Sequence, residues 1–159
     1  MSIKQGDNVP QVSFTHMTAD GPKPISSDEV FKGKKVVLFA LPGAFTPTCS
    51  ASHLPGFVVN ADKLKAAGID TIACLSVNDA FVMDAWGKAQ NAEEILMLAD
   101  GSAEFTRAMG LEFELTDRGM GVRSQRYAML VDDGVIKNLN VEAGGQFEVS
   151  SAETMLGLL

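Results

Sequence analysis

Cysteine and histidine are scarce in this chain. Its 159 residues include two cysteines, Cys49 and Cys74, and two histidines, His16 and His53. A disulfide-rich scaffold needs several cysteine pairs, and a structural zinc site needs four Cys or His ligands close together. The composition therefore excludes a disulfide framework, offers no complete set of metal ligands and favours a reducing compartment.

Long apolar runs and an excess of positive charge are also lacking. No stretch approaches the roughly 18 apolar residues of a membrane-spanning helix, and residues 1–8 lack the apolar core of a secretory signal. The formal net charge is −7, so anionic membranes and phosphate backbones would repel most of the surface. We expect no membrane and no nucleic acid as a partner. We also expect a cytoplasmic location, or an organelle if a targeting segment has been removed.

Linkers, internal repeats and low-complexity tracts are absent from the sequence. Hydrophobic residues make up 46% of the chain and charged residues 21%, which is typical of a soluble globular protein. A chain of this length can bury roughly two-thirds of its unfolded surface without disulfides or metals. The sequence therefore predicts a single domain that spans residues 1–159.

Two apolar runs, residues 34–41 and 71–77, predict strands that are covered on both faces. A helical pattern from about residue 47 to 67, ended by Gly68, lies between them. Strand, helix and strand in this order form a crossover that brings the two strands parallel. The pattern predicts an α/β domain.

The remaining patterns add further elements around this unit. They predict a strand or hairpin around 12–22, a helix after a capping box at 26–29, a helix capped by Asn78 and Asp79, a strand at 95–98, a short helix ended by Gly110, a loop with Gly119 and Gly121, a hairpin of 126–131 and 135–139, and a helix after a capping box at 150–153. Because the last two strands are antiparallel, we expect a mixed sheet.

The segment Pro42–Cys49 follows the first buried strand directly. Thr46 suits the N-cap of a helix and Pro47 its first position, so Cys49 falls at the third position. Unpaired backbone N–H groups and the positive end of the helix dipole favour an anion there. We therefore expect Cys49 to ionise readily and to act as a nucleophile.

The alternative for any free cysteine is a buried packing residue, which is the commoner role. Cys74 lies inside an apolar strand and is interpreted in that way. Cys49 differs because it lies at a strand-to-helix junction, and such junctions form the edge of the sheet where α/β proteins bind ligands.

A Pro-x-x-x-Thr-x-x-Cys spacing and a distant arginine stand out among five characteristic segments. These segments are residues 42–49, 74–79, 98–102, 123–129 and 149–153. Together they resemble the type II (type V) peroxiredoxins, which have a thioredoxin-like fold, and they are more similar to the plant and bacterial members than to the animal ones. The resemblance covers nearly the whole chain. It implies a mixed central sheet flanked by helices on both faces, and reduction of hydrogen peroxide and alkyl hydroperoxides by Cys49.

The residues around Cys49 suit that reaction. Thr46 lies three residues before Cys49, where its hydroxyl can cap the helix and still donate to the sulfur or to the peroxide. Arg126 begins a strand predicted to run antiparallel to the one that ends at Leu41, so its side chain returns to the same edge of the sheet. Its guanidinium can hold the thiolate and polarise the peroxide. The resemblance implies that Pro42 shields the thiolate from water.

Two other residues are interpreted as taking no part in the reaction. His53 follows Cys49 by four residues, a spacing compatible with a Cys–His pair, but we expect it to lie behind the sulfur and away from the pocket. Arg123 precedes Arg126 by three residues and is interpreted as unconnected with the reaction.

The expected recycling route follows from a departure from the family pattern. Animal members place a resolving cysteine in the loop before the last helix, where this chain has the thiol-free segment 144–150. The sulfenic acid of Cys49 must then react with an external thiol, or with Cys74 after substantial unfolding. The resemblance implies glutathione with glutaredoxin as the first candidate reductant and thioredoxin as the second. We expect no bound cofactor.

Other possibilities stay open on the sequence alone. The resemblance implies a homodimer through the face that carries Phe45, Phe81 and Trp86. A thiol-disulfide oxidoreductase is disfavoured because Thr46 stands where a Cys-x-x-Cys motif has its first cysteine. A peroxide sensor or redox docking module, oxidised at Cys49 once per molecule, is the alternative to an enzyme.

Overall fold

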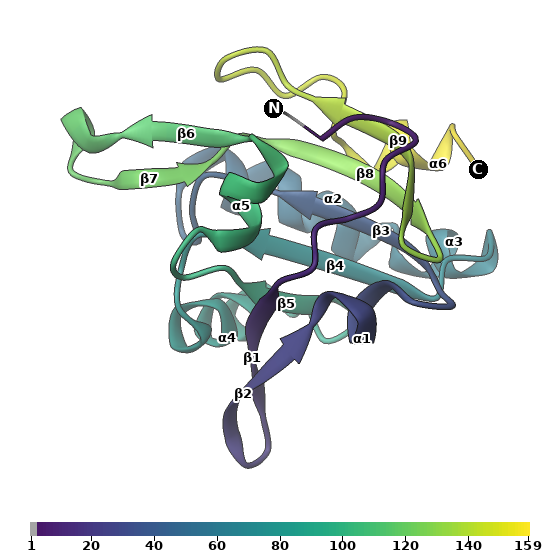
Figure 1. Ribbon diagram of the computed structural model, residues 1–159, viewed down its shortest axis with the longest axis horizontal. Coiled ribbons are helices and arrows are strands. Elements are labelled where there is room, and N and C mark those ends of the chain that lie inside the picture. Colours follow the sequence, from purple (N-terminus) through teal and green to yellow (C-terminus); the bar gives the residue numbers. More distant parts are fainter. Residues whose placement is uncertain (1–2) are drawn as a thin grey trace.

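A seven-stranded mixed sheet forms the centre of the molecule in the computed structural model, which describes residues 3–159 (Figure 1). The strand order is β2-β1-β5-β4-β3-β8-β9. These strands are β1 (Ser13–Thr18), β2 (Gly21–Ser26), β3 (Lys35–Ala40), β4 (Thr71–Ser76), β5 (Leu96–Ala99), β8 (Tyr127–Asp132) and β9 (Val135–Val141). The α-helices are α1 (Ser27–Phe31), α2 (Leu54–Val59), α3 (Ala61–Ala66), α4 (Ala80–Ala89), α5 (Glu104–Met109) and α6 (Ala152–Leu156). The predicted α/β class with a mixed sheet is confirmed.

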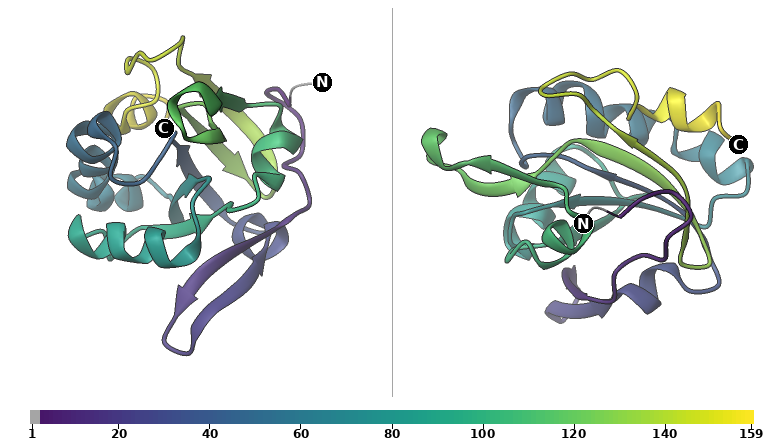
Figure 2. Two further views of the ribbon diagram at one scale, coloured as in Figure 1. Left: turned by 90° about the vertical axis from the view of Figure 1, so that its left-hand side faces the viewer. Right: turned by 45° about the horizontal axis from the view of Figure 1, so that its top comes forward.

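Helices cover both faces of the sheet (Figure 2). The side chains of β3 alternate between two apolar cores. Val37 and Phe39 belong to the core beneath α2, α3, α4 and α6. Val36 and Leu38 belong to the core on the other face, with α1 and α5. A strand that is buried on both faces needs apolar residues at successive positions, which explains the continuous run in the sequence.

The pairing of the central strands brings Arg126 to the predicted edge of the sheet. β3 is parallel to β4 and β4 is parallel to β5, whereas β8 is antiparallel to β3 and to β9. Ala40 at the end of β3 pairs with Tyr127 at the start of β8. Arg126 directly precedes β8, so it lies where the chain leaves β3 toward Pro42.

The long helix predicted over 47–67 is interrupted. Helical structure begins at Pro47 as expected. From Cys49 it continues as a π-helical turn, η1 (Cys49–His53), which precedes α2, and the Leu54 N–H donates to the Cys49 carbonyl. Pro55 explains the wider turn, because proline has no N–H and its ring clashes with the carbonyl of the preceding turn of a regular α-helix. Asn60 then separates α2 from α3, with its side-chain amide donating to a backbone carbonyl in α2.

The loop predicted around Gly119 and Gly121 is wrong in part, because its flanks form a hairpin. β6 (Glu112–Leu115) and β7 (Gly121–Ser124) pair antiparallel and are joined by the 3₁₀ turn η2 (Thr116–Arg118). This hairpin projects from the body of the molecule (Figure 1). The two glycines adopt positive φ at the turn, as their side-chain-free backbone allows, and the alternation in the short flanking strands was overlooked.

One of the two predicted capping boxes is confirmed. The Ser26 side chain accepts from the Glu29 N–H, and Glu29 bonds back to the Ser26 N–H. The box at 150–153 is wrong, because Ser151 is the N-cap of α6 and the Ser150 hydroxyl donates to Glu142 instead. That bond becomes important at the active site.

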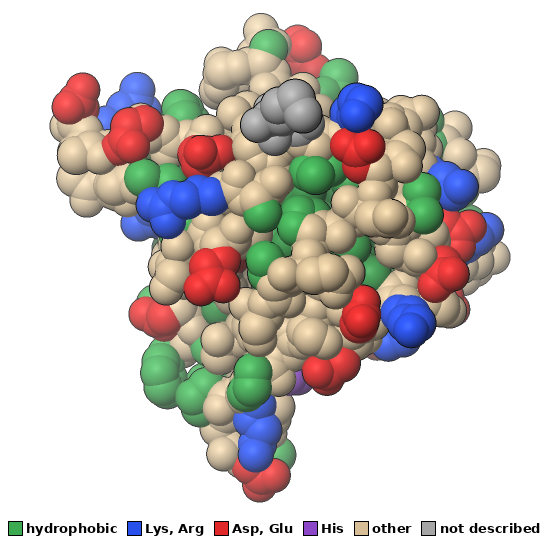
Figure 3. All heavy atoms as spheres, in the orientation of Figure 1, with side chains coloured by type: hydrophobic (Ala, Val, Ile, Leu, Met, Phe, Trp, Pro, Cys, Tyr) green, Lys and Arg blue, Asp and Glu red, His purple; other side chains and the backbone are tan. Residues whose placement is uncertain are grey.

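The surface view shows acidic and basic side chains interspersed over one face (Figure 3). Within residues 3–159 no helix has both the length and the apolar character needed to cross a bilayer.

Candidate active site

Cys49 opens the π-helical turn and is fully buried, in the same core as Leu54 and Phe57. The thiol lies near the start of a helix, as predicted, and is out of contact with solvent. The Arg126 Nη2 donates to the Cys49 Sγ at 3.1 Å. A guanidinium at this distance stabilises a negative charge on the sulfur.

Arg126 uses its two terminal nitrogens on two different partners. Nη2 contacts the sulfur, and Nη1 lies 2.8 Å from the His53 Nδ1. The guanidinium carbon also lies 5.9 Å from the centre of the Phe147 ring, which is a cation–π contact. These three contacts fix the orientation of the guanidinium plane. The predicted approach of Arg126 to Cys49 is confirmed.

His53 makes its hydrogen bonds to Arg126 and Ser150 and not to the Cys49 sulfur, which agrees with the expectation that it does not form a Cys–His pair; its contact with Arg126 was not predicted. Its Nε2 lies 2.9 Å from the Ser150 carbonyl oxygen, which can only accept, so the hydrogen-bond network assigns the proton to Nε2. Nδ1 then offers a lone pair to Arg126. Burial and the charge of Arg126 lower the pKa of His53 to about 3, so the ring stays neutral. His53 orients Arg126.

Spacing alone could have placed His53 near Cys49, since residues four apart share one side of a helix. What the sequence could not supply was its second partner. Ser150 lies 97 residues further along the chain, in the segment before α6. The pairing exists only once the fold has brought that segment over η1.

Thr46 lies in the turn before Cys49, but its hydroxyl is oriented differently from the prediction. The hydroxyl donates to the Gly43 carbonyl at 2.6 Å. Its proton is therefore in use, and its lone pairs remain to accept a hydrogen bond. The expectation that Thr46 donates to the sulfur or the substrate does not match this geometry, because the nearby carbonyl takes the proton.

Arg123, which was interpreted as unconnected with the reaction, donates hydrogen bonds to the backbone beside the site. Its Nη1 donates to the Pro42 carbonyl at 3.2 Å and its Nε to the Met120 carbonyl at 2.8 Å. The β6–β7 hairpin is thereby tied to the segment that precedes Cys49. Pro42 itself is half-buried beside Arg126.

A cavity of about 250 Å³ opens beside this cluster. It is lined by Pro42, Phe113, Gln125, Arg126, Glu142, Gly144 and Gly145. Arg126 both lines this cavity and contacts the Cys49 sulfur, so it connects the open space with the buried thiol. The walls combine apolar side chains with the polar groups of Gln125, Arg126 and Glu142, which suits a small substrate with a polar end and an apolar end.

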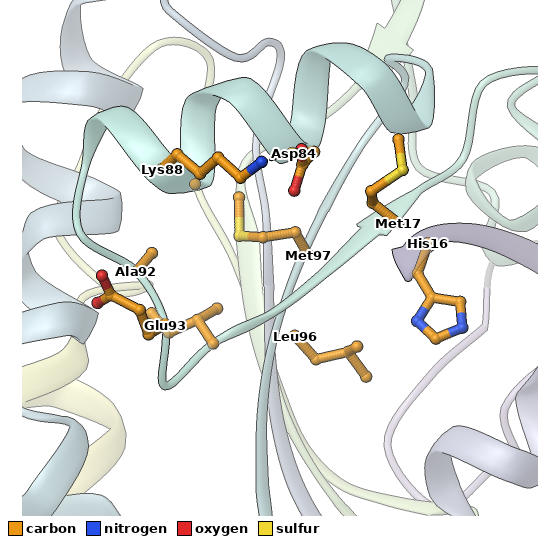
Figure 4. A pocket seen from close by; sticks show the side chains of 10 residues that line it. His16, Met17, Asp84, Lys88, Ala92, Glu93, Leu96 and Met97 are labelled. Carbon is orange, nitrogen blue, oxygen red and sulfur yellow. Dashed lines mark ion pairs between the residues drawn. The ribbon is translucent and has the colours of Figure 1, made fainter. Parts of the chain in front are cut away.

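A second cavity, of about 290 Å³, lies between α4, β1 and β5 (Figure 4). His16 and Glu93 line it, together with Asp84 and Lys88, which form an ion pair at 3.0 Å. No cysteine contributes to its lining. Within residues 3–159 no three His, Cys, Asp or Glu side chains are grouped to hold a metal ion.

Cys74 lies on β4 opposite Phe39 of β3 and is fully buried. Burial raises the pKa of its thiol well above the usual range, and a charge on Cys49 would raise it further. The interpretation of Cys74 as a packing residue agrees with this environment.

Glu142 is a buried acidic residue that the sequence analysis missed. It is 7% exposed, lines the cavity with Arg126 and accepts hydrogen bonds from the segment 148–150. Burial opposes its ionisation, but the hydrogen bonds from Ser150, Glu148 and Val149 outweigh that effect and lower its pKa. Its place shortly after the strand predicted at 135–139 is a signal that could have drawn attention to it.

Comparison with known proteins gives consistent results. Residues 4–156 match the Redoxin family model. The chain is 52% identical to peroxiredoxin-2E-2, chloroplastic, of Oryza sativa subsp. japonica, over 99% of this chain and 73% of that protein. It is 50% identical to peroxiredoxin-2D of Arabidopsis thaliana, over 99% and 98% of the two chains. The crystal structure of reduced Prx3 from Vibrio vulnificus in complex with H2O2 is 60% identical and superposes with a TM-score of 0.96 over 98% of each chain.

Proposed function

Because this chain belongs to the redoxin family and, within it, to the peroxiredoxins, we propose that its Cys49 is the residue that peroxide oxidises to a sulfenic acid. The chain is a thiol-dependent peroxidase with the thioredoxin-like fold of that family. The observation that carries the assignment of the nucleophile is the 3.1 Å contact between the Arg126 Nη2 and the Cys49 Sγ. At Cys74 the charge of Arg126 does not offset burial, which disfavours the thiolate.

In the proposed reaction the Cys49 thiolate attacks one peroxide oxygen. The S–O bond forms as the O–O bond breaks, and the departing alkoxide or hydroxide takes a proton from water, leaving Cys49 as a sulfenic acid. Arg126 donates to the sulfur and to the peroxide as charge moves between them. Thr46, whose proton is held by Gly43, accepts the hydrogen bond of the peroxide O–H. Pro42 keeps bulk water away from the sulfur.

We propose hydrogen peroxide and small alkyl hydroperoxides as substrates. The cavity beside Arg126 has an apolar side formed by Pro42 and Phe113, which supports binding of a short alkyl group. The relative from Vibrio vulnificus is known in complex with H2O2, which supports hydrogen peroxide as a substrate of this chain.

Recycling is proposed to use an external thiol, glutathione with glutaredoxin first and thioredoxin second, with no bound cofactor. The thiol attacks the sulfenic sulfur, water leaves and a mixed disulfide forms, which a second thiol reduces. Cys49 is buried, so the turn that carries it must open first. The π-helical turn and Pro55 support such opening, because they weaken the regular helix at this point.

A homodimer is proposed through the face next to the active site. Phe45 and Phe81 are 57% and 65% exposed, which is unusual for large apolar side chains. Trp86, expected on the same face, is fully buried. The centres of its ring and the Phe45 ring lie 6.4 Å apart, so Trp86 packs beneath Phe45. A second copy of the chain would cover the two phenylalanines. We also propose a cytoplasmic location and partners that include neither membrane nor nucleic acid.

The decisive test is turnover of peroxide by variants at the two cysteines. Cys49→Ser should abolish consumption of hydrogen peroxide and of tert-butyl hydroperoxide with either reductant, while Cys74→Ser should keep most of the activity. Multiple turnovers with glutaredoxin and glutathione would support the enzyme, whereas one equivalent consumed per chain would support the sensor. Full activity of Cys49→Ser would contradict the assignment of the nucleophile.

A further inference from the structure

Glu142 lies next to Arg126 on the neighbouring strand. It follows the last residue of β9, and its own backbone N–H donates to the Arg126 carbonyl at 2.9 Å. Its side chain is buried, although a carboxylate is rarely buried without specific partners. The peroxidase mechanism proposed above gives this carboxylate no part in the chemistry, so its burial needs another explanation.

The partners of the carboxylate come from three consecutive residues. Oε2 accepts from the N–H groups of Glu148 at 2.9 Å, Val149 at 2.8 Å and Ser150 at 2.8 Å, and from the Ser150 hydroxyl at 2.6 Å. Oε1 accepts from the Glu148 N–H at 2.9 Å. Backbone N–H groups that converge in this way form a concave anion site, and here the anion belongs to the same chain. The segment 148–150 is thereby held in one conformation.

The same segment supplies the partner of His53. The Ser150 carbonyl accepts the Nε2 proton of His53, whose Nδ1 in turn lies 2.8 Å from the Arg126 Nη1. The other end of the guanidinium contacts the Cys49 sulfur. A continuous set of hydrogen bonds therefore runs from Glu142 through Ser150, His53 and Arg126 to Cys49.

We propose that Glu142 is a positioning residue for peroxide reduction. Its carboxylate holds the Ser150 carbonyl where it fixes the proton of His53 on Nε2, and this keeps Nδ1 available to orient Arg126 toward the Cys49 sulfur. The inference rests on the proposed role of Cys49 and deepens it. Glu142 lines the same cavity as Arg126, but both of its carboxylate oxygens accept hydrogen bonds from the segment 148–150, so it acts through Ser150 and His53.

The tautomer of His53 is the link that makes this role specific. If the Ser150 carbonyl moves away, the Nε2 proton loses its acceptor and the ring is free to carry its proton on Nδ1. An Nδ1–H would then face the Nη1 donor of Arg126, and two donors repel. The guanidinium would turn, and a displacement of about 1 Å at a reacting centre can cost a hundredfold in rate.

The test compares two variants that each remove one negative charge. Glu142→Gln replaces one acceptor oxygen with an N–H₂ that faces backbone donors. Asp117→Asn changes an exposed side chain in the turn between β6 and β7, outside this network, and is the matched control. Trp86, the one tryptophan of the sequence, donates to the Ser50 hydroxyl at 3.0 Å next to Cys49, so its fluorescence can follow oxidation in a stopped-flow experiment.

We expect Glu142→Gln to lower the second-order rate of oxidation by hydrogen peroxide about ten- to a hundredfold, with the control unchanged. Nitrogen-15 NMR of the imidazole should show the Nε2–H tautomer of His53 in the wild type and in the control, and its loss in Glu142→Gln. A structural defect alone would lower the melting temperature without moving the tautomer.

Ser150→Ala keeps the test decisive if Glu142→Gln does not fold. It removes one hydrogen bond to the carboxylate and so holds the Ser150 carbonyl less firmly against His53, so we expect a partial loss of the Nε2–H tautomer and a rate about two- to threefold lower. The proposal is overturned if either folded variant loses the tautomer at an unchanged rate, or keeps both the tautomer and the rate. A wild type that fails to consume peroxide would instead overturn the proposed function.

Discussion

Cys49 and Cys74 occupy similar places in the fold and differ in what surrounds them. Both sulfurs are fully buried and belong to one apolar core. Cys74 lies on β4, opposite Phe39 of β3, and Cys49 follows the end of β3 after a short connection. Burial alone therefore does not distinguish the two thiols.

The separation comes from the donors that reach each sulfur. Arg126, which directly precedes β8, donates to Cys49 of η1 at the end of the sheet. Burial and the charge of Cys49 raise the pKa of the Cys74 thiol well above the usual range, and the charge of Arg126 offsets this only in part. The comparison teaches that a nearby cation does not by itself outweigh burial, and that the two sulfurs differ in the direct hydrogen bond that Arg126 donates to Cys49.

The largest expected effect comes from making the surroundings of Cys49 resemble those of Cys74. Arg126→Gln removes the charge that faces the sulfur, and the rate of peroxide reduction should fall by about 10²–10³-fold, as for other donors aimed at developing charge. Steady-state assays with hydrogen peroxide measure the loss as kcat/KM. Arg118→Gln, at the exposed tip between β6 and β7, removes the same charge far from the sulfur and should keep the wild-type rate. Equal losses in both variants would mean that net charge, not the contact, matters.

Much of the fold was predictable because its signals are local. Each of these signals depends on residues within one element or one turn. They are the continuous apolar runs of the buried strands, the capping box at 26–29 and the hairpin around Asp133. The failures have local causes too, since Pro55 and Asn60 break a helix that the apolar pattern alone extends to residue 67. The β6–β7 hairpin was missed because four-residue strands carry little periodicity.

The site was predictable only as far as its residues share the motif or the neighbouring strand. Arg126 could be placed because antiparallel pairing with β3 returns it to the edge where Cys49 lies. The roles of His53 and Glu142 depend on Ser150, which lies in a segment without regular structure before α6. No spacing rule links these three residues, because only the packed fold brings them together.

A smaller effect, on stability, follows from the neutral His53 beside Arg126. Burial and the Arg126 charge lower the pKa of His53 from its usual 6.5 to about 3. Between these values the unfolded chain binds one more proton than the folded chain. The contribution of His53 to the free energy of unfolding is therefore fully present above pH 6.5. It falls by about 1.4 kcal/mol per pH unit as the pH drops toward 3. Urea unfolding at several values between pH 7 and 5 measures this slope before the carboxylates titrate.

His53→Asn should flatten that slope, because asparagine does not titrate while its Oδ1 can still accept from Arg126. His16→Gln is the matched control, since it removes the other histidine of the sequence from the second cavity. If the slope disappears in the His16 variant and persists in the His53 variant, the titrating group is His16. That result would contradict the argument that the His53 ring is neutral.

The smallest expected effect on catalysis is at Cys74, and it sharpens the contrast between the two thiols. Cys74→Ala removes a buried sulfur and should lower the free energy of unfolding by about 1–2 kcal/mol. Cys74→Ser should cost about 1–3 kcal/mol more, because its hydroxyl enters an apolar core. Neither variant touches Arg126, so the rate of Cys49 oxidation measured by Trp86 fluorescence should stay at the wild-type value. A stability order of alanine above serine with unchanged rates would identify Cys74 as a packing residue, whereas a loss of rate in both would couple the two sulfurs in the reaction.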